Sequence, residues 1–233
     1  MKRNGNGIDW AVTLTGENLI FSLLGKILYT ELDKAWLQSL IDEDIFAESP
    51  FGESQAEVQL GLEYLREWSR ENQSGISDQV FLDLQADNMR LFVGIGKVLA
   101  PIWESVYFND ERMVFQEETL QVRSWFRRFK LESEKLYQEP DDHLGLELAF
   151  VAHLALLGLQ ALEQNDEAAF QQSLDAQRHF LSEHLLKWAL KWAKLVNQYS
   201  KTNFYRGVSH LVCGTLIEAA SLVGARKPEE ITR

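Results

Sequence analysis

The chain has few residues that would divide it into parts or cross-link it. It contains four prolines and one cysteine in 233 residues, and stretches rich in glycine, serine or proline are missing. Because Cys213 has no partner for an internal disulfide, we expect it to pack as a small apolar residue. The lack of linkers leaves the charged stretch 131–141 as the candidate hinge. We therefore expect a single domain over residues 1–233.

Positive charge is also scarce. Lys and Arg number 23 against 35 Asp and Glu, which gives a formal net charge of −12. The averaged field of such a protein repels phosphate backbones and attracts cationic ligands. The composition therefore argues against a nucleic-acid partner.

Apolar runs are too short for a membrane span. The longest, Leu148–Leu159, is interrupted by His153 and falls short of the roughly 20 residues that a span needs. The N-terminal residues Met1–Gly7 are not followed by the apolar stretch and cleavage site of an export signal. We therefore expect a cytoplasmic protein without stable membrane insertion.

Apolar residues at spacings of three and four run along most of the chain and predict an all-α fold. The predicted helices are Glu17–Tyr29, Lys34–Phe46, Gln55–Asn72, Asp78–Phe92, Glu117–Leu131, Asp142–Leu162, Glu167–Gln198 with a possible break, and Phe204–Val223. Ser54 with Glu57 has the spacing of a capping box, and Asn165 is in position to cap the next-to-last helix. Gly94 and Gly96 are expected to end the fourth helix.

Two segments break this periodicity. The segment Lys97–Gln116 contains Pro101, Trp103 and Tyr107 without a helical repeat, and it is expected to fold as a loop against the core. The other is Glu139–His143, with the sequence EPDDH. It places acids, an imidazole and a rigid turn together, a combination that can bind a cation or move a proton.

Asp142 and His143 allow several interpretations. As a catalytic pair, the carboxylate would orient the imidazole as a general base, but the sequence marks no nucleophile or phosphate loop. His143 and Glu147 share a helix face, as metal ligands often do, but further ligands are not specified, and we predict no metal site. Helix capping by Asp141 or Asp142 is the structural alternative.

Three motifs in one order resemble the TorD/DmsD family of cytoplasmic chaperones for twin-arginine-exported molybdoenzymes. They are Leu91–Gly94 (LFVG), Pro101–Tyr107 (PIWESVY) and Glu139–His143. The second motif resembles the DmsD branch most, and the resemblance covers most of the chain. The family often has an aromatic residue where this chain has Asn88 and a glycine where it has Phe115-Gln116.

The resemblance implies an all-helical chaperone that proofreads Tat export. Such a protein binds the twin-arginine signal peptide of a molybdenum-containing reductase precursor, similar to DMSO or TMAO reductase, and delays export until the cofactor is loaded. It is not an enzyme and carries no cofactor of its own. Transferred by position, the leader-binding residues are Tyr29, Leu91, Phe92, Pro101, Trp103, Tyr107, Glu139, Pro140, Asp142 and His143.

The chemistry of such a ligand defines what its receptor needs. A leader joins two arginines to an apolar stretch, so carboxylates must lie beside a groove of aromatic and aliphatic side chains. Glu139 and Asp142 are expected to pair with the guanidinium groups, and the aromatic residues to cover the apolar part.

Other possibilities stay open at this point. A small helical enzyme or nucleotide-binding protein would use Asp142 and His143, and an architectural subunit would use neither. The protein is either a monomer or a dimer whose protomers exchange halves at the hinge 131–141.

Overall fold

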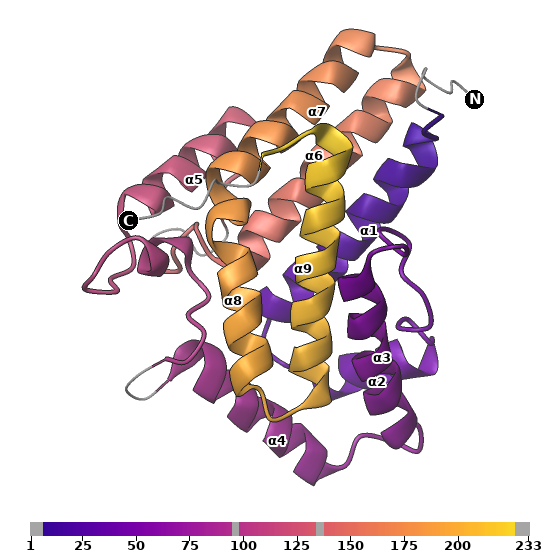
Figure 1. The fold of residues 1–233 in the computed structure, drawn as a ribbon, viewed down its shortest axis with the longest axis vertical. Coiled ribbons are helices and arrows are strands. Elements are labelled where there is room, and N and C mark those ends of the chain that lie inside the picture. The colour runs from indigo at the N-terminus through magenta and orange to yellow at the C-terminus, as the bar shows by residue number, and fades with distance from the viewer. Residues whose placement is uncertain (1–6, 95–97, 134–137, 227–233) are drawn as a thin grey trace.

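The computed structural model describes residues 7–94, 98–133 and 138–226. Within these ranges the chain forms nine α-helices, two π-helical turns and one 3-10 turn, without a β-strand, which confirms the predicted all-α fold (Figure 1). The elements are α1 (Trp10–Tyr29), α2 (Lys34–Asp42), α3 (Ala56–Glu71), α4 (Asp78–Asn88), η1 (Met89–Val93), η2 (Glu104–Tyr107), α5 (Glu117–Arg128), α6 (Leu144–Gln164), α7 (Glu167–Phe180), η3 (Leu181–Leu185), α8 (Leu186–Tyr199) and α9 (Asn203–Val223).

Helices α1 and α6 form the central pair of the fold and pack against each other along much of their length. Gly25 and Gly145 lie where the two helices cross. A Cβ on either glycine would lie 2.8 Å from the carbonyl oxygen of the other. Since no real Cβ tolerates such a contact, only glycine lets the backbones approach this closely. The same crossing brings Tyr29, the last residue of α1, to the first turn of α6.

Both central helices have the length and apolar composition of a membrane span. In each, the apolar window is substantially buried inside the fold, 50% in α1 and 61% in α6. Helix α6 also packs on α7, and α1 also contacts α9. Packing within the described part of the chain therefore accounts for their composition.

A second layer is formed by α3, α8 and α9, in which α9 packs on both of the others (Figure 1). Their aromatic residues supply much of its interior. Trp188 and Trp192 of α8 are fully buried, as is Phe180 at the end of α7, whereas Tyr199 at the end of α8 is 37% exposed.

Some predicted helix starts are wrong because local capping was misread. Helix α1 begins at Trp10 rather than Glu17, since the carboxylate of Asp9 accepts a hydrogen bond of 3.3 Å from the amide of Val12. That cap satisfies an amide at the helix start.

The two predicted caps are also in the wrong place. Helix α3 is preceded by Gln55, whose side chain makes no capping bond, so Ser54 does not form the expected capping box. Asn165 ends α6 in the left-handed conformation, and Asp166 caps α7 in its place. Asparagine suits both positions, and the sequence did not discriminate between them.

Two π-helical turns interrupt the helical runs. One, η1, extends α4 and ends at Gly94, which has a φ of 63° and stops the helix as predicted. Gly96, the second predicted stop, lies outside the described residues. The other, η3, divides the predicted helix Glu167–Gln198 into α7 and α8, which confirms the expected break. Such turns occur frequently at functional sites.

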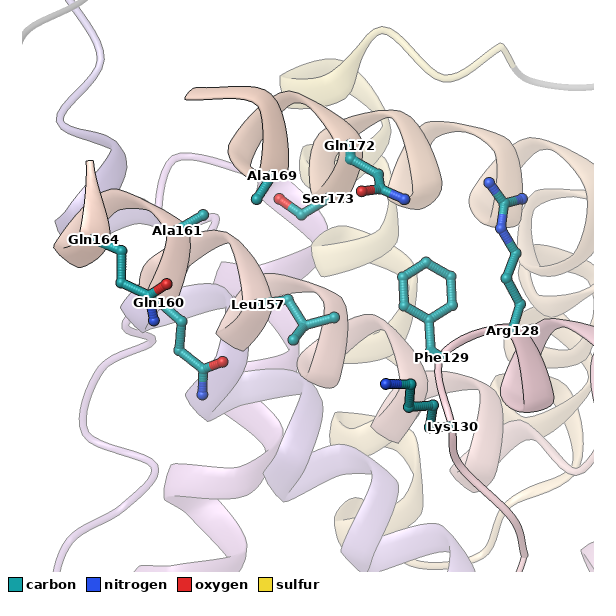
Figure 2. A pocket seen from close by; sticks show the side chains of 10 residues that line it. All are labelled: Arg128, Phe129, Lys130, Leu157, Gln160, Ala161, Gln164, Ala169, Gln172 and Ser173. Carbon is teal, nitrogen blue, oxygen red and sulfur yellow. The ribbon is translucent and has the colours of Figure 1, made fainter. Parts of the chain in front are cut away.

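Cavities open between the helices at several places. One of about 340 Å³ lies between the end of α5, α6 and α7 (Figure 2). One of about 270 Å³ is lined by apolar side chains that include Leu19 and Ile45. A third of about 250 Å³ lies between the end of α5 and the first turns of α6.

The predicted hinge 131–141 falls only partly within the described chain, because residues 134–137 lie outside it. The hinge therefore stays a prediction. So does the choice between a monomer and a swapped dimer.

Candidate functional site

The two motif segments that the sequence placed together lie side by side. Residues 102–104 pair with residues 142–144 through two backbone hydrogen bonds of 2.9 and 3.0 Å. An isolated antiparallel bridge joins Trp103 to His143. This short pairing fixes the loop before α5 to the start of α6.

An aromatic and acidic cluster forms at this junction. The indole nitrogen of Trp103 donates a hydrogen bond of 2.7 Å to the carboxylate of Glu139. The ring of His143 meets Trp103 and Tyr29 edge-on, with centroid distances of 6.0 and 5.2 Å. Trp103, Glu139 and Tyr29 are all half-buried, so each presents part of its side chain to a ligand.

Asp142 does not reach this surface. It is fully buried, and its two carboxylate oxygens accept hydrogen bonds from the Ser105 amide at 2.7 Å and the Thr119 hydroxyl at 2.6 Å. Asp142 is therefore not placed to pair with an incoming guanidinium, as we had expected. It anchors the loop through Ser105 and Thr119 instead. The neighbouring Asp141 is also buried and pairs with Arg123.

Helix α6 is capped by His143 rather than by either aspartate. The His143 Nδ1 accepts a hydrogen bond of 3.0 Å from the amide of Gly145. The proton of a neutral ring then sits on the other nitrogen. A carboxylate that orients a histidine base accepts from its ring N–H, whereas the Asp142 oxygens accept from Ser105 and Thr119, so this arrangement disfavours a catalytic pair of Asp142 and His143.

Leu91 and Phe92, both in η1, lie in the core instead of at the cluster surface. Leu91 is 0% and Phe92 4% exposed. Phe92 stacks on Trp192 at 5.9 Å and meets Tyr205 edge-on at 5.3 Å. In this structure Phe92 packs against α8 and α9 in the core, which a transfer by motif position did not indicate.

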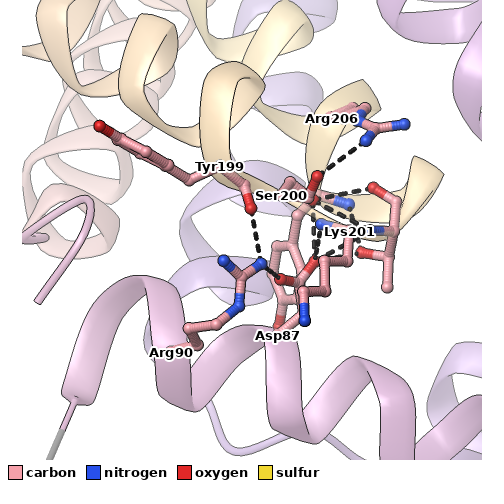
Figure 3. Close-up of polar contacts among 8 residues, drawn as sticks. Asp87, Arg90, Tyr199, Ser200, Lys201 and Arg206 are labelled. Atoms are coloured by element: carbon pink, nitrogen blue, oxygen red, sulfur yellow. Dashed lines mark hydrogen bonds and ion pairs between the residues drawn. The ribbon is translucent and has the colours of Figure 1, made fainter.

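A polar network fixes the element that carries these two residues (Figure 3). Asp87 at the end of α4 accepts hydrogen bonds from the Ser200 hydroxyl and from the two backbone amides that follow it, at 2.8 to 3.0 Å. Arg90 donates both to Asp87 and to the carbonyl of Tyr199. Burial would raise the pKa of Asp87, but these hydrogen bonds outweigh it and lower the pKa.

Pro101, Tyr107 and Pro140 shape the loop around the cluster. The Tyr107 hydroxyl donates a hydrogen bond of 2.8 Å to the carbonyl of Pro101. Its ring packs on Trp188 at 5.1 Å, and the amine of Lys191 lies 5.6 Å from the ring centroid. Burial raises the pKa of the Tyr107 hydroxyl, which therefore stays protonated. Both prolines are buried.

Buried acids lie beneath the loop, and the sequence analysis did not assign them to the site. The carboxylate of Glu104 lies 2.7 Å from His184 Nδ1 in η3. Glu147 is fully buried, and a hydrogen bond with the Trp188 side chain offsets this burial only in part. Burial raises the pKa of Glu147 well above its ordinary value, and the neighbouring Glu104 and Asp142 raise it further. Burial also raises the pKa of Glu104.

An apolar cavity begins next to the cluster. Its lining residues are Phe126, Leu131, Glu132, Ser133, Leu146, Ala149, Phe150 and His153. Leu146 lies one helical turn from His143, and spacings of three, four and three place His143, Leu146, Phe150 and His153 on one face of α6. The spacing is visible in the sequence, but the three motifs do not include Leu146, Phe150 or His153. Glu132 adds an exposed carboxylate to the rim.

The cluster and this cavity together form what we call the α6 surface: Tyr29, Trp103, Glu139 and His143 at one end, and the cavity residues at the other. It combines carboxylates, aromatic rings and apolar side chains. Such a surface can hold a ligand that is cationic at one end and apolar along the rest.

Comparison with known proteins places the chain in a family. The model described as "Nitrate reductase delta subunit" matches residues 52–194, which is more than half of the chain. A "Chaperone protein TorD" of Aliivibrio salmonicida is 29% identical over 131 residues, covering 56% of this chain and 60% of the relative. A "Probable Tat proofreading chaperone DmsD" of Haemophilus influenzae is 24% identical over 204 residues, covering 88% and 90%. A "Chaperone protein TorD" of Shewanella pealeana is 27% identical over 202 residues, covering 82% of each.

The fold and the matching family model define an all-helical protein of the nitrate reductase delta subunit type. With relatives named TorD and DmsD, the chain belongs to the TorD/DmsD family. The match spans only 60% of the length of the Aliivibrio TorD chains. The nearer likeness to the DmsD branch stays a prediction.

Proposed function

We propose that this protein binds the twin-arginine signal peptide of a molybdenum-containing reductase precursor in the cytoplasm and delays its export until the cofactor is loaded. The observation that carries the proposal is the pairing of residues 102–104 with 142–144, which joins Trp103 and Glu139 to the apolar face of α6. The relatives' names, TorD and DmsD chaperones, support the same function.

The two parts of a leader match the two kinds of side chain on the α6 surface. One arginine pairs with Glu139, which uses only one of its two carboxylate oxygens for Trp103, and the other pairs with Glu132 at the cavity rim. The apolar stretch lies in the cavity between Leu131 and Phe150. Glu132 takes the place that the sequence analysis gave to the buried Asp142.

Energetics favour moderate affinity. A charge-assisted hydrogen bond contributes about 1.5–3 kcal/mol, and each buried large apolar side chain contributes a similar amount. Ordering a disordered peptide costs about 2–5 kcal/mol. A micromolar dissociation constant is the expected result, and it allows the leader to be released for export.

The leader-binding function requires no covalent chemistry. The alternative, an enzyme or nucleotide-binding protein that uses Asp142 and His143, is disfavoured by the burial of Asp142 and by the capping bond to His143 Nδ1. The protein acts as a binding chaperone.

Titration of a leader peptide by calorimetry tests the proposal. Replacing both arginines of the peptide with glutamine is expected to weaken binding about 100-fold or more, because two charge-assisted contacts of about 1.5–3 kcal/mol each are lost. Glu139→Gln should lower the affinity for the native peptide and leave the affinity for the glutamine peptide unchanged. Glu43→Gln, at an exposed acid after α2, is the matched control. Equal affinities for the two peptides would contradict the proposal.

A further inference from the structure

A second binding surface lies in the cavity of about 340 Å³ between the end of α5, α6 and α7 (Figure 2). Its lining residues are Arg128, Phe129, Lys130, Leu157, Gln160, Ala161, Gln164, Ala169, Gln172 and Ser173. It shares no lining residue with the cavity of the α6 surface. The two cavities therefore offer separate sites.

Two cations line this cavity, one on each side of the Phe129 ring (Figure 2), in a chain of net charge −12. Arg128 and Lys130 are exposed, and neither forms an ion pair with another described residue. The Arg128 guanidinium lies 5.3 Å from the ring centroid of Trp125 and 5.9 Å from that of Phe129. This stacking orients the guanidinium before any ligand arrives, which lowers the entropic cost of binding.

Lys130 occupies an unfavourable backbone conformation. Its φ is 60°, a left-handed value that glycine or asparagine adopts at much lower cost. The residue follows the end of α5, where the Leu131 amide bonds to the Phe126 carbonyl at 2.9 Å. A lysine that costs stability at this position keeps its amine at the edge of the cavity.

The remainder of the lining is suited to a peptide. Figure 2 shows the Phe129 ring between α6 and α7, with Gln172 of α7 near it and Gln160 and Gln164 of α6 farther along the cavity, beyond Leu157. A side-chain amide both donates and accepts hydrogen bonds, as a peptide group does. Phe129 and Leu157 supply apolar area beside these amides.

We propose that this cavity docks an acidic peptide segment of a partner protein. One carboxylate of the segment pairs with Arg128 and a second with Lys130, on the two sides of the Phe129 ring, and an aliphatic side chain between them packs on Phe129 and Leu157. The glutamine amides hold the segment's backbone. Because its ligand is anionic whereas a leader is cationic, this site is independent of the α6 surface and extends the proposed function with a second contact.

The test uses the full chain and a blocked peptide of alternating glutamate and leucine. We expect saturable binding that weakens with added salt and is lost when the peptide carries glutamine in place of glutamate. Arg128→Gln and Lys130→Asn are each expected to weaken binding about three- to tenfold. Lys194→Gln removes the same charge from an exposed position of α8 and should leave binding unchanged.

Two further readouts separate this proposal from others. Lys130→Asn should raise the melting temperature and weaken binding of the acidic peptide. It should leave the affinity for the leader peptide unchanged. The proposal would be overturned if the glutamine peptide bound as tightly as the glutamate peptide. It would also be overturned if Lys194→Gln weakened binding as much as Arg128→Gln and Lys130→Asn do. Displacement of the peptide by inorganic phosphate at similar concentration would instead identify a simple anion site and also overturn it.

Discussion

Asp142 illustrates how a residue can determine a surface that it does not reach. Its carboxylate accepts hydrogen bonds from the Ser105 amide and the Thr119 hydroxyl, and its backbone carbonyl accepts one from the Glu104 amide. These bonds hold the Trp103 loop against α6. The sequence placed this acid next to the aromatic loop, but it could not show that the carboxylate faces inward.

Replacing Asp142 with alanine should reduce stability and not affinity alone. The change leaves a buried amide and a buried hydroxyl without an acceptor, so the free energy of unfolding is expected to fall by about 2–4 kcal/mol. Urea denaturation followed by circular dichroism measures the loss. Asp110→Ala, at an exposed acid, should stay within about 0.5 kcal/mol of the wild type. A wild-type midpoint for Asp142→Ala would show that the carboxylate is not an anchor.

At the scale of elements, the crossing of α1 and α6 sets the position of the site. Gly25 and Gly145 let the backbones touch, and the contact brings Tyr29 to the start of α6, where its ring meets His143. The spacing of these helices therefore determines the spacing of two site residues that are far apart in sequence.

Gly145→Ala tests this arrangement. Alanine favours a helix over glycine by about 1 kcal/mol, but its Cβ would lie 2.8 Å from both the Gly25 carbonyl oxygen and the Tyr29 Cβ. We expect a net loss of about 1–3 kcal/mol in thermal unfolding, together with weaker leader binding. Ser22→Ala, at an exposed position of α1, is the control for helix propensity alone. Unchanged or increased stability of Gly145→Ala would show that the helices can separate freely.

Much of the element order followed from apolar spacing, and the errors have physical causes. The predicted helix Lys34–Phe46 is too long, because α2 ends at Asp42 and Asp44 takes a φ of 52°, although Phe46 beyond it is buried. A buried side chain can belong to a turn as well as to a helix. The π-helical turns were not predicted as such, since they change the helical pitch without a marked residue pattern.

The candidate site was predicted only in part. Motif order brought Trp103 and Glu139 together, and the structure joins them by a hydrogen bond. The remaining residues differ in burial, because Phe92 and Asp142 are fully enclosed in the core while Tyr29 is half-buried. That division depends on tertiary packing, which a single sequence does not contain.

At the scale of the whole molecule, buried acids make stability depend on pH. Glu17 in α1 is fully buried, and burial raises its pKa from 4.5 to about 8, while a hydrogen bond from Gln177 lowers it in part. In the amide orientation that satisfies both groups, Gln177 donates to Glu17 over 3.1 Å. The pKa of Glu147 is raised in the same direction.

Stability is therefore expected to fall as pH rises from about 4.5 to about 8. In this interval the unfolded chain releases the Glu17 proton while the folded chain keeps it, so deprotonation favours unfolding. The Glu17 contribution is fully present below pH 4.5, and at most about 5 kcal/mol is lost by pH 8. Glu17→Gln removes the titration and should flatten this part of the curve in urea denaturation. An unchanged slope would show that Glu17 ionises normally in the folded state.

The molecule as a whole offers two rival apolar cavities to a leader. One belongs to the α6 surface beside Trp103 and Glu139, and the other lies near Leu19 and Ile45. Both have similar volumes, about 250 and 270 Å³. We assign the leader to the cavity of the α6 surface, because of these two cavities it is the one next to the aromatic and acidic cluster.

Photo-cross-linking from the apolar stretch of a twin-arginine leader peptide tests that assignment most directly. The account predicts adducts on the first turns of α6, around Leu146 and Phe150, that disappear when the peptide arginines are replaced with glutamine. Adducts around Leu19 and Ile45 instead, with the same yield from both peptides, would contradict it.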